Sequence, residues 1–212
     1  MTAPVLIAFP KGRLGDELVP RLAGTPLALD AAALKSRVLR IPTATPGVSA
    51  LLLKGADLPR YVAAGVASLG IVGSDTLDEL DMDLLELADL GIGACRLCLC
   101  APADITLEDL KARPHLRLAT KFLRATEAWL AREGLTAELV PLSSSVELAP
   151  LLGLADAIVD LVQTGATLKA HGLTVTAVLG RSSARLIAAR GAILSEPGRI
   201  RPLAEVLLRA LT

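Results

Sequence analysis

Short apolar runs alternate with amphipathic stretches along almost the whole chain. The runs that predict strands are 4–9, 36–41, 48–53, 69–72, 96–101, 116–119, 137–141, 157–162, 175–179 and 184–188. Between them, helical spacing of apolar residues predicts helices over 16–22, 58–64, 76–80, 107–112, 125–133 and 146–152. Such alternation predicts an α/β protein with mostly parallel sheets.

The number of predicted strands is high for one compact sheet in a chain of 212 residues. Two lobes fit the pattern better, because the regions around Gly91 and Gly93 and after Gly180 offer places where the chain can pass from one lobe to the other. We therefore expect lobe I to comprise 1–92 plus 182–212, and lobe II to comprise 93–181.

Composition restricts the classes of function. Apolar residues make up 52% of the chain and aromatic residues only 2%, so Leu, Ala, Val and Ile must build the core. Lys and Arg total 22 against 22 Asp and Glu, so no global field recruits nucleic acid or an anionic membrane, and any anion site must be local. Neither an apolar span of about 18 residues nor a signal peptide is evident, which predicts a cytoplasmic protein.

The three cysteines lie close together in the run CRLCLCAP, at Cys95, Cys98 and Cys100. An odd number in one short run argues against a disulfide framework. The C-x-x-C spacing has no second pair, and both histidines lie in other segments, so buried apolar cysteines are favoured over a zinc site. We predict no metal ligands in the protein.

The segment 153–168, GLADAIVDLVQTGATL, carries the clearest chemistry. A buried strand over 157–162 is followed by a glycine turn and a helix start, which together point several backbone N–H groups at one concavity. Gly165 lets the backbone approach a ligand, and the Thr164 and Thr167 hydroxyls add donors for phosphate oxygens. The segment predicts an anion site, although an ordinary strand-to-helix turn is the alternative.

Two carboxylates precede this loop, Asp156 and Asp160. They would repel a phosphate, so we interpret them as acceptors for neutral hydroxyl groups such as those of a ribose. A loop that suits a phosphate, next to carboxylates that suit two neighbouring hydroxyl groups, predicts a ribose phosphate as ligand. Neither the Walker loop nor the G-x-G-x-x-G fingerprint of dinucleotide sites occurs in the chain.

Other predicted strands also end in loops that suit anions, and ligands of α/β sheets bind at such ends. These loops contain Lys11, Gly12 and Arg13; Gly73 and Ser74; Lys121; and Ser145 with Glu147, where a serine can cap the following helix. Arg37 and Lys54 add cations in strand-flanked segments, and solvated edge charges are the alternative for each. Several cations at strand ends in a chain of zero net charge suit substrates that carry many phosphates.

Strings of residues along nearly the whole chain resemble the catalytic subunit of ATP phosphoribosyltransferase in its short form. They are PKGRL at 10–14, SRVLRIPT at 36–43, DLPRYVAAG at 57–65, LGIVGSDTLDE at 69–79, GIGACRL at 91–97, LATK at 118–121, SVELAPLLGLADAIVDLVQTGATL at 145–168 and SARLIAAR at 183–190. The resemblance implies transfer of a 5-phosphoribosyl group from phosphoribosyl pyrophosphate to a ring nitrogen of the adenine of ATP, with release of pyrophosphate. This reaction is the first step of histidine biosynthesis.

The resemblance also implies architecture and partners. It implies two lobes like those of a type II periplasmic binding protein, with the active site in the cleft between them, and magnesium carried by the substrate. The short form implies that the chain lacks a C-terminal regulatory domain. It implies instead a regulatory subunit related to histidyl-tRNA synthetase, with a homodimer of this chain inside a hetero-oligomer.

Site roles follow from the matched motifs. The resemblance implies that the loop 164–167 cradles the 5-phosphate, that Asp160 belongs to the sugar site, and that Arg13 and Arg37 act catalytically on the departing pyrophosphate. The predicted donor site comprises Asp156, Asp160, Thr164, Gly165, Ala166 and Thr167, and the predicted ATP and polyphosphate site comprises Lys11, Gly12, Lys54, Gly73, Ser74, Arg96, Lys121, Ser145 and Glu147.

Five positions depart from the family pattern, namely Ser68, Ser144, His171, Phe122 and Trp129. The changes at Ser68 and Ser144 put any role of those two side chains in doubt. Two alternatives remain at this point. One is a non-catalytic receptor of the same fold, and the other is a purine-salvage phosphoribosyltransferase, against which the long string at 145–168 argues.

Overall fold

The computed structural model describes residues 4–34 and 37–212. Contacts divide the chain into two compact units, the first made of residues up to Gly93 together with Ser183–Thr212, the second of Ala94–Ser182. These boundaries lie one residue from those expected from the sequence. Each unit has its own sheet and its own core.

The first unit is built on a six-stranded sheet in the order β2-β3-β1-β4-β11-β5. Its strands are β1 Val5–Pro10, β2 Arg40–Pro42, β3 Val48–Leu53, β4 Leu69–Gly73, β5 Leu85–Asp89 and β11 Ala184–Ala188. β1 runs parallel to both β3 and β4, so the carboxyl ends of these three strands meet at one edge. The pairs β2–β3, β4–β11 and β11–β5 are antiparallel.

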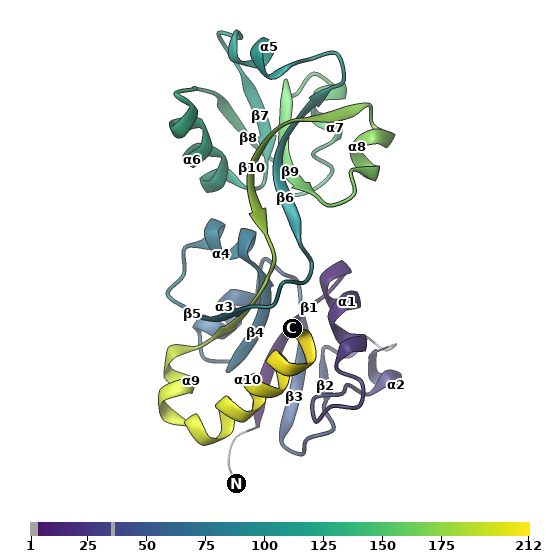
Figure 1. Cartoon of the computed structure of the whole chain (residues 1–212), viewed down its shortest axis with the longest axis vertical. Helices are drawn as coiled ribbons and strands as arrows, with labels where there is room; N and C mark the ends of the chain where they lie inside the picture. The colour runs from purple at the N-terminus through teal and green to yellow at the C-terminus, as the bar shows by residue number, and fades with distance from the viewer. Residues whose placement is uncertain (1–3, 35–36) are drawn as a thin grey trace. The chain divides into compact units, whose positions relative to one another are not determined.

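Helices cover both faces of this sheet (Figure 1). They are α1 Arg13–Arg21, α2 Ala31–Leu34, α3 Leu58–Ala63, α4 Ser74–Leu80, α9 Arg190–Ser195 and α10 Pro197–Leu211. Leu18 of α1 and Leu207 of α10 belong to one apolar cluster with Ile7 of β1. Leu58 of α3 packs in a second cluster with Ala8, whose side chain points to the other face because strand residues alternate.

The second unit is built on a five-stranded sheet in the order β10-β6-β9-β7-β8. Its strands are β6 Cys95–Pro102, β7 Arg117–Thr120, β8 Glu138–Pro141, β9 Ala157–Val162 and β10 Leu173–Ser182. β9, β7 and β8 are parallel, whereas β6 is antiparallel to both β9 and β10. β9 therefore lies inside the sheet, as its apolar sequence predicts.

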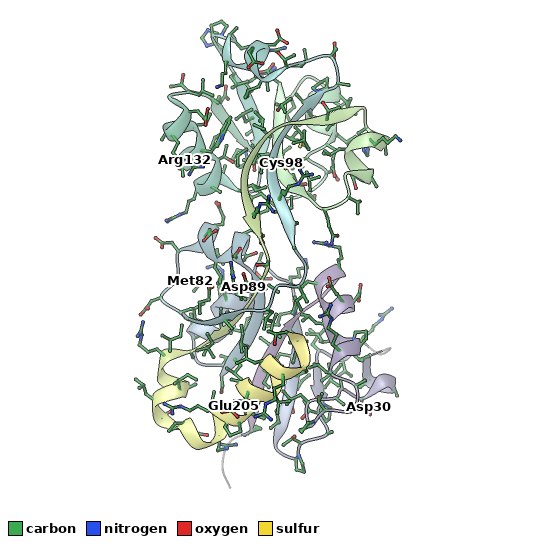
Figure 2. All side chains as sticks on the ribbon, viewed as in Figure 1. Asp30, Met82, Asp89, Cys98, Arg132 and Glu205 are labelled. Carbon is green, nitrogen blue, oxygen red and sulfur yellow. The ribbon has the colours of Figure 1, made fainter. Side chains whose placement is uncertain are left out.

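The helices of the second unit also lie on both faces of its sheet (Figure 1). They are α5 Leu107–Lys111, α6 Leu123–Glu133, α7 Leu148–Leu151 and α8 Ala166–Ala170. Trp129 of α6 packs in one cluster, and Leu168 of α8 packs in another with Cys98 and Cys100. Cys98 lies on β6 among the apolar side chains of this unit (Figure 2), and all three cysteines are buried, as predicted.

Strand direction differs from the prediction of mostly parallel sheets, because both sheets are mixed. A single residue, Ser183, separates β10 from β11. One extended segment thus gives a strand to each sheet, and both of these strands run antiparallel to their neighbours.

The predicted strand 36–41 is wrong over most of its length. β2 begins only at Arg40, Arg37–Leu39 form an exposed loop, and Ser36 lies outside the described residues. Val38 and Leu39 are about half exposed, at 54% and 49%. These two apolar side chains are therefore not buried in a sheet. The sequence does not predict β5, since LELAD carries two acidic residues, Glu86 and Asp89.

No helix in the described part of the chain has both the length and the apolar character needed to cross a membrane.

Candidate active site

The loop after β9 has the strand–turn–helix form expected from the sequence. β9 is largely buried, α8 begins at Ala166, and Gly165 is the N-cap residue with a φ of 77° in the left-handed region. A Cβ at Gly165 would meet no atom nearer than Val162 Cγ1 at 4.0 Å. Glycine is needed there for its backbone conformation, since the surroundings leave space for a side chain.

The threonines of this loop are exposed, and Thr164 Oγ1 accepts a hydrogen bond from the Ala166 N–H at 3.4 Å. At the start of α8, the first N–H groups have no acceptor within the helix. Backbone donors and two hydroxyl groups are therefore gathered in one short exposed segment.

Asp160 lies near the end of β9 with 23% of its side chain exposed, and its carboxylate is 3.7 Å from Lys121 Nζ. Burial raises the pKa of Asp160 above its ordinary value, and the nearby Glu147 carboxylate acts in the same direction. Lys121 and the Leu161 N–H lower this pKa in part. Asp160 is therefore protonated more easily than an exposed aspartate. It lies close to Lys121, on the strand that leads into the loop.

Arg96 of β6 is paired in register with Val162, the last residue of β9, and its side chain is exposed. The structure therefore brings Arg96, Asp160 and Lys121 to the end of the sheet where the loop begins. Arg181 of β10 lies opposite Arg96 in the next pair of strands, although nothing in the sequence marked it as a site residue.

Ser145 has a φ of 53°, which is unusual for a residue other than glycine. α7 begins at Leu148 with Glu147 as its N-cap residue and no side-chain capping bond, so the prediction that a serine of this loop caps the helix is wrong. The Ser145 carbonyl instead accepts the Leu148 N–H, which closes a turn before the helix. Glu147 is half-buried and close enough to act on Asp160.

Asp156 does not join this group, which corrects its predicted place in the ribose site. It precedes β9, whereas the loop follows β9, and a strand of that length spans roughly 20 Å. Its side chain is 11% exposed, and its carboxylate accepts the Arg117 N–H at 2.8 Å and pairs with Arg113 Nη1 at 2.7 Å. Asp156 therefore links the start of β9 to Arg113 and to the start of β7 at Arg117, and it stabilises the fold there.

In the first unit, the predicted anion-binding residues meet at the edge where β1, β3 and β4 end. Lys11 follows β1 and donates its N–H to the Leu53 carbonyl at 2.7 Å, which sets it beside Lys54. Lys11, Gly12 and Arg37 line a pocket of about 500 Å³ whose other walls are mainly apolar. Three predicted residues from two separate segments thus share one pocket.

Two further features define this edge. A Cβ at Gly15 would overlap the Pro10 carbonyl oxygen, so this glycine lets α1 start close to the end of β1. Arg13 is exposed in the first turn of α1. At the end of β4, Gly73 is the N-cap residue of α4, and the Ser74 N–H is already used by the Ser183 carbonyl at 3.0 Å.

In the described ranges, 4–34 and 37–212, no three His, Cys, Asp or Glu side chains are grouped so that they could hold a metal ion.

Comparison with known proteins agrees with the motifs. A family model described as HisG, ATP phosphoribosyltransferase, matches residues 54–209. The ATP phosphoribosyltransferase of Moorella thermoacetica is 40% identical over 216 residues, covering 99% of this chain and 94% of the relative. That of Deinococcus deserti is 46% identical over 203 residues, covering 95% and 90%.

Solved structures show the same fold. The ATP phosphoribosyl transferase (HisG:HisZ) complex from Thermotoga maritima has a chain that superposes with a TM-score of 0.82 at 25% identity, covering 98% of both chains. The periplasmic aliphatic sulphonate binding protein SsuA of Escherichia coli superposes with a TM-score of 0.62 at 17% identity, covering 99% of this chain and 73% of that one, and shows the fold alone. The predicted two-lobed class like periplasmic binding proteins is thereby confirmed. The chain belongs to the ATP phosphoribosyltransferase family, whose enzymes catalyse the first step of histidine biosynthesis.

Proposed function

We propose that the second unit of this ATP phosphoribosyltransferase binds phosphoribosyl pyrophosphate through the loop after β9. The observation that carries the proposal is the left-handed Gly165, which opens α8 directly behind the partly buried Asp160. Thr164 and Thr167, with the backbone N–H groups of the loop, donate hydrogen bonds to the 5-phosphate. The Asp160 carboxylate accepts hydrogen bonds from the ribose hydroxyls.

The cations of the first unit are assigned to the polyphosphates. Displacement at the anomeric carbon passes through an oxocarbenium-like state, so the enzyme must align the adenine nitrogen and stabilise the leaving pyrophosphate. Arg13 and Arg37 suit the second task, because a guanidinium meets phosphate oxygens bidentately and stays charged. The remaining contacts to ATP and to the polyphosphates of the two substrates come from Lys11, Gly12, Lys54, Gly73, Ser74, Arg96, Lys121, Ser145 and Glu147.

Magnesium belongs to this proposal as an ion carried by the substrate. Bound to phosphate oxygens, Mg²⁺ neutralises part of the charge on the diphosphate and keeps most of its water ligands, so it requires few protein ligands. The exposed cations and hydroxyls of this chain suit a metal–diphosphate complex, since they bind the phosphate oxygens that the ion leaves free.

We also infer that the chain works in the cytoplasm with a regulatory subunit related to histidyl-tRNA synthetase, as a homodimer within a hetero-oligomer. The Thermotoga maritima relative was solved as a HisG:HisZ complex. Four leucines in and after α7 are exposed, and such a patch is typical of a surface that another subunit covers. They are Leu148, Leu151, Leu152 and Leu154.

Mass spectrometry tests the proposed reaction. The purified chain is incubated with ATP, phosphoribosyl pyrophosphate and magnesium, with and without the second subunit, and phosphoribosyl-ATP is the expected product. Binding of both substrates without any adduct in either mixture would indicate a receptor. Formation of a nucleoside monophosphate from a free purine base would indicate a salvage enzyme.

Replacing Arg37 tests the role in leaving-group departure. Arg37→Ala is expected to lower kcat by roughly 10²-fold or more and to change substrate affinity much less, since the charge on pyrophosphate grows only towards the transition state. Steady-state kinetics and direct binding measurements separate the two effects. Arg60→Ala, at an exposed position of α3, is the control, and a loss of affinity alone in Arg37→Ala would refute the role.

Replacing Asp156 tests the corrected assignment. Asp156→Asn is expected to destabilise the protein by about 1–3 kcal/mol, because the Arg117 N–H loses a charged acceptor, and to leave donor affinity unchanged. Thermal unfolding and calorimetry with phosphoribosyl pyrophosphate measure the two quantities. Asp104→Asn, an exposed residue of the same unit, serves as control. Weaker donor binding at unchanged stability would return Asp156 to the ribose site.

A further inference from the structure

Two arginines face each other across neighbouring strands of the second unit. Arg181 of β10 is the register partner of Arg96 of β6, and both side chains are exposed. Directly opposed residues of an antiparallel pair point to the same face, with Cβ atoms roughly 4.5–5.5 Å apart. Two register shifts in β10, between Val175 and Ala177 and between Val178 and Gly180, produce this alignment.

The charges of this pair are not balanced by a carboxylate of the described residues. Among the described residues, neither guanidinium has a carboxylate as an ion-pair partner, whereas Arg113 and Arg117 of the same unit share Asp156. Asp160, on the neighbouring strand β9, is paired with Lys121. Like charges placed directly opposite each other destabilise a sheet, so this arrangement costs stability in the absence of an anion.

The position of the pair indicates the chemistry of the missing anion. Arg96 is also the register partner of Val162, after which the loop Gln163–Thr167 begins. That loop contains no Lys or Arg, so its backbone and hydroxyl donors leave the charge of a bound phosphate uncompensated. Guanidinium groups meet phosphate oxygens bidentately and bind them more strongly than neutral donors do.

We propose that Arg96 and Arg181 together bind a phosphate group of the phosphoribosyl donor. The inference rests on the proposed function and adds Arg181, a binding residue absent from the predicted site. The 5-phosphate and the diphosphate offer the same chemistry to two guanidiniums, and they are distinguished by two probes, ribose 5-phosphate and inorganic pyrophosphate.

Calorimetry on the full chain tests the pair with both probes at fixed ionic strength. Arg181→Ala is expected to weaken the binding of one probe about tenfold or more, as loss of a charge-assisted contact does. Arg96→Ala is expected to weaken the same probe, and the double variant to lose less than the product of the two single effects, because the residues act on one group. Arg181→Lys should recover part of the affinity. Arg201→Ala, at an exposed position of α10, should bind as the unaltered chain does.

Thermal unfolding without ligand separates binding from a structural role. Removing one of two opposed like charges should leave Tm unchanged or raise it, so Arg181→Ala is expected to be at least as stable as the unaltered chain. A lowered Tm accompanied by weaker binding would overturn the proposal in favour of a structural role. An equal loss of affinity in Arg201→Ala would overturn the proposal, because it would show that binding depends on the net charge of the chain and not on this pair of arginines.

Unchanged affinity of Arg181→Ala for both probes would also overturn the inference. The proposed function fails separately, because it requires donor binding to disappear when Gly165 is replaced. Loss of binding in the Gly165 variant together with full binding in Arg181→Ala would leave the loop assignment standing and remove only the arginine pair.

Discussion

Gly165→Val is expected to abolish binding of phosphoribosyl pyrophosphate and, with it, turnover, while the second unit stays folded. The φ of 77° at this residue is disfavoured for any L-residue by about 1–2 kcal/mol, and more for a β-branched one. The loop should relieve this strain by adopting another conformation, in which its N–H groups no longer point at one phosphate. Because hydrogen bonds to a charged group contribute roughly 1.5–3 kcal/mol each, losing several corresponds to an affinity loss of about 100-fold or more.

The surroundings make this a test of the loop rather than of packing. A Cβ at Gly165 has no neighbour closer than 4.0 Å, so the substitution creates no clash in the core. Gly153 is a matched control in the same unit, since its φ is 73° and nothing lies within 4 Å of its Cβ position. Calorimetry and circular dichroism on Gly165→Val and Gly153→Val should show equal folding and a loss of donor binding in the first alone. Unchanged affinity in Gly165→Val would remove the loop from the donor site.

Asp160→Asn is expected to weaken donor binding strongly and to make the unliganded protein more stable. An amide accepts hydrogen bonds from ribose hydroxyls less well than a carboxylate does, because the charge that strengthens them is gone. Burial raises the pKa of Asp160, so folding disfavours its charged form, and the neutral Asn removes that cost at pH 7. For a chain of this length, relief of 1 kcal/mol corresponds to a rise in Tm of about 2–4 °C.

The pH dependence has a definite sign. Since the folded pKa of Asp160 lies above its ordinary value of 3.8, the folded state holds the proton more tightly than the unfolded state. The Asp160 contribution to stability therefore falls as pH rises from 3.8 through the raised pKa. The Tm difference between Asp160→Asn and the unaltered chain should be largest at neutral pH and shrink as pH falls towards 3.8. Lower stability of the variant at neutral pH, or donor affinity equal to that of the unaltered chain, would contradict this role for Asp160.

Strand prediction succeeded where an apolar run is buried and failed where it is exposed. β3, β9 and β11 begin and end at the predicted residues, and most of their side chains are buried or half-buried. Val38 and Leu39 have the same composition but lie in an exposed loop. Composition alone does not distinguish these cases, because burial depends on what the rest of the chain packs against the segment.

The site could be predicted to the level of loops but not of every side chain. Lys11, Gly12 and Arg37 are each predicted as anion-binding residues, and they line one pocket. β1 and β3 are parallel and end at one edge of the sheet, and β2, which is antiparallel to β3, begins at that edge. Asp156 was placed with Asp160 because the two are near in sequence, yet most of β9 lies between them. The sequence could not predict Arg181 as a site residue, because its alignment with Arg96 depends on two register shifts in β10.

A crystal structure of the chain with phosphoribosyl pyrophosphate and magnesium tests the donor site most directly. We expect the 5-phosphate to accept hydrogen bonds from backbone N–H groups and hydroxyls of Thr164–Thr167, and the ribose hydroxyls to donate to Asp160. A 5-phosphate bound instead at Lys11–Arg13, with the loop after β9 free of ligand, would contradict the assignment.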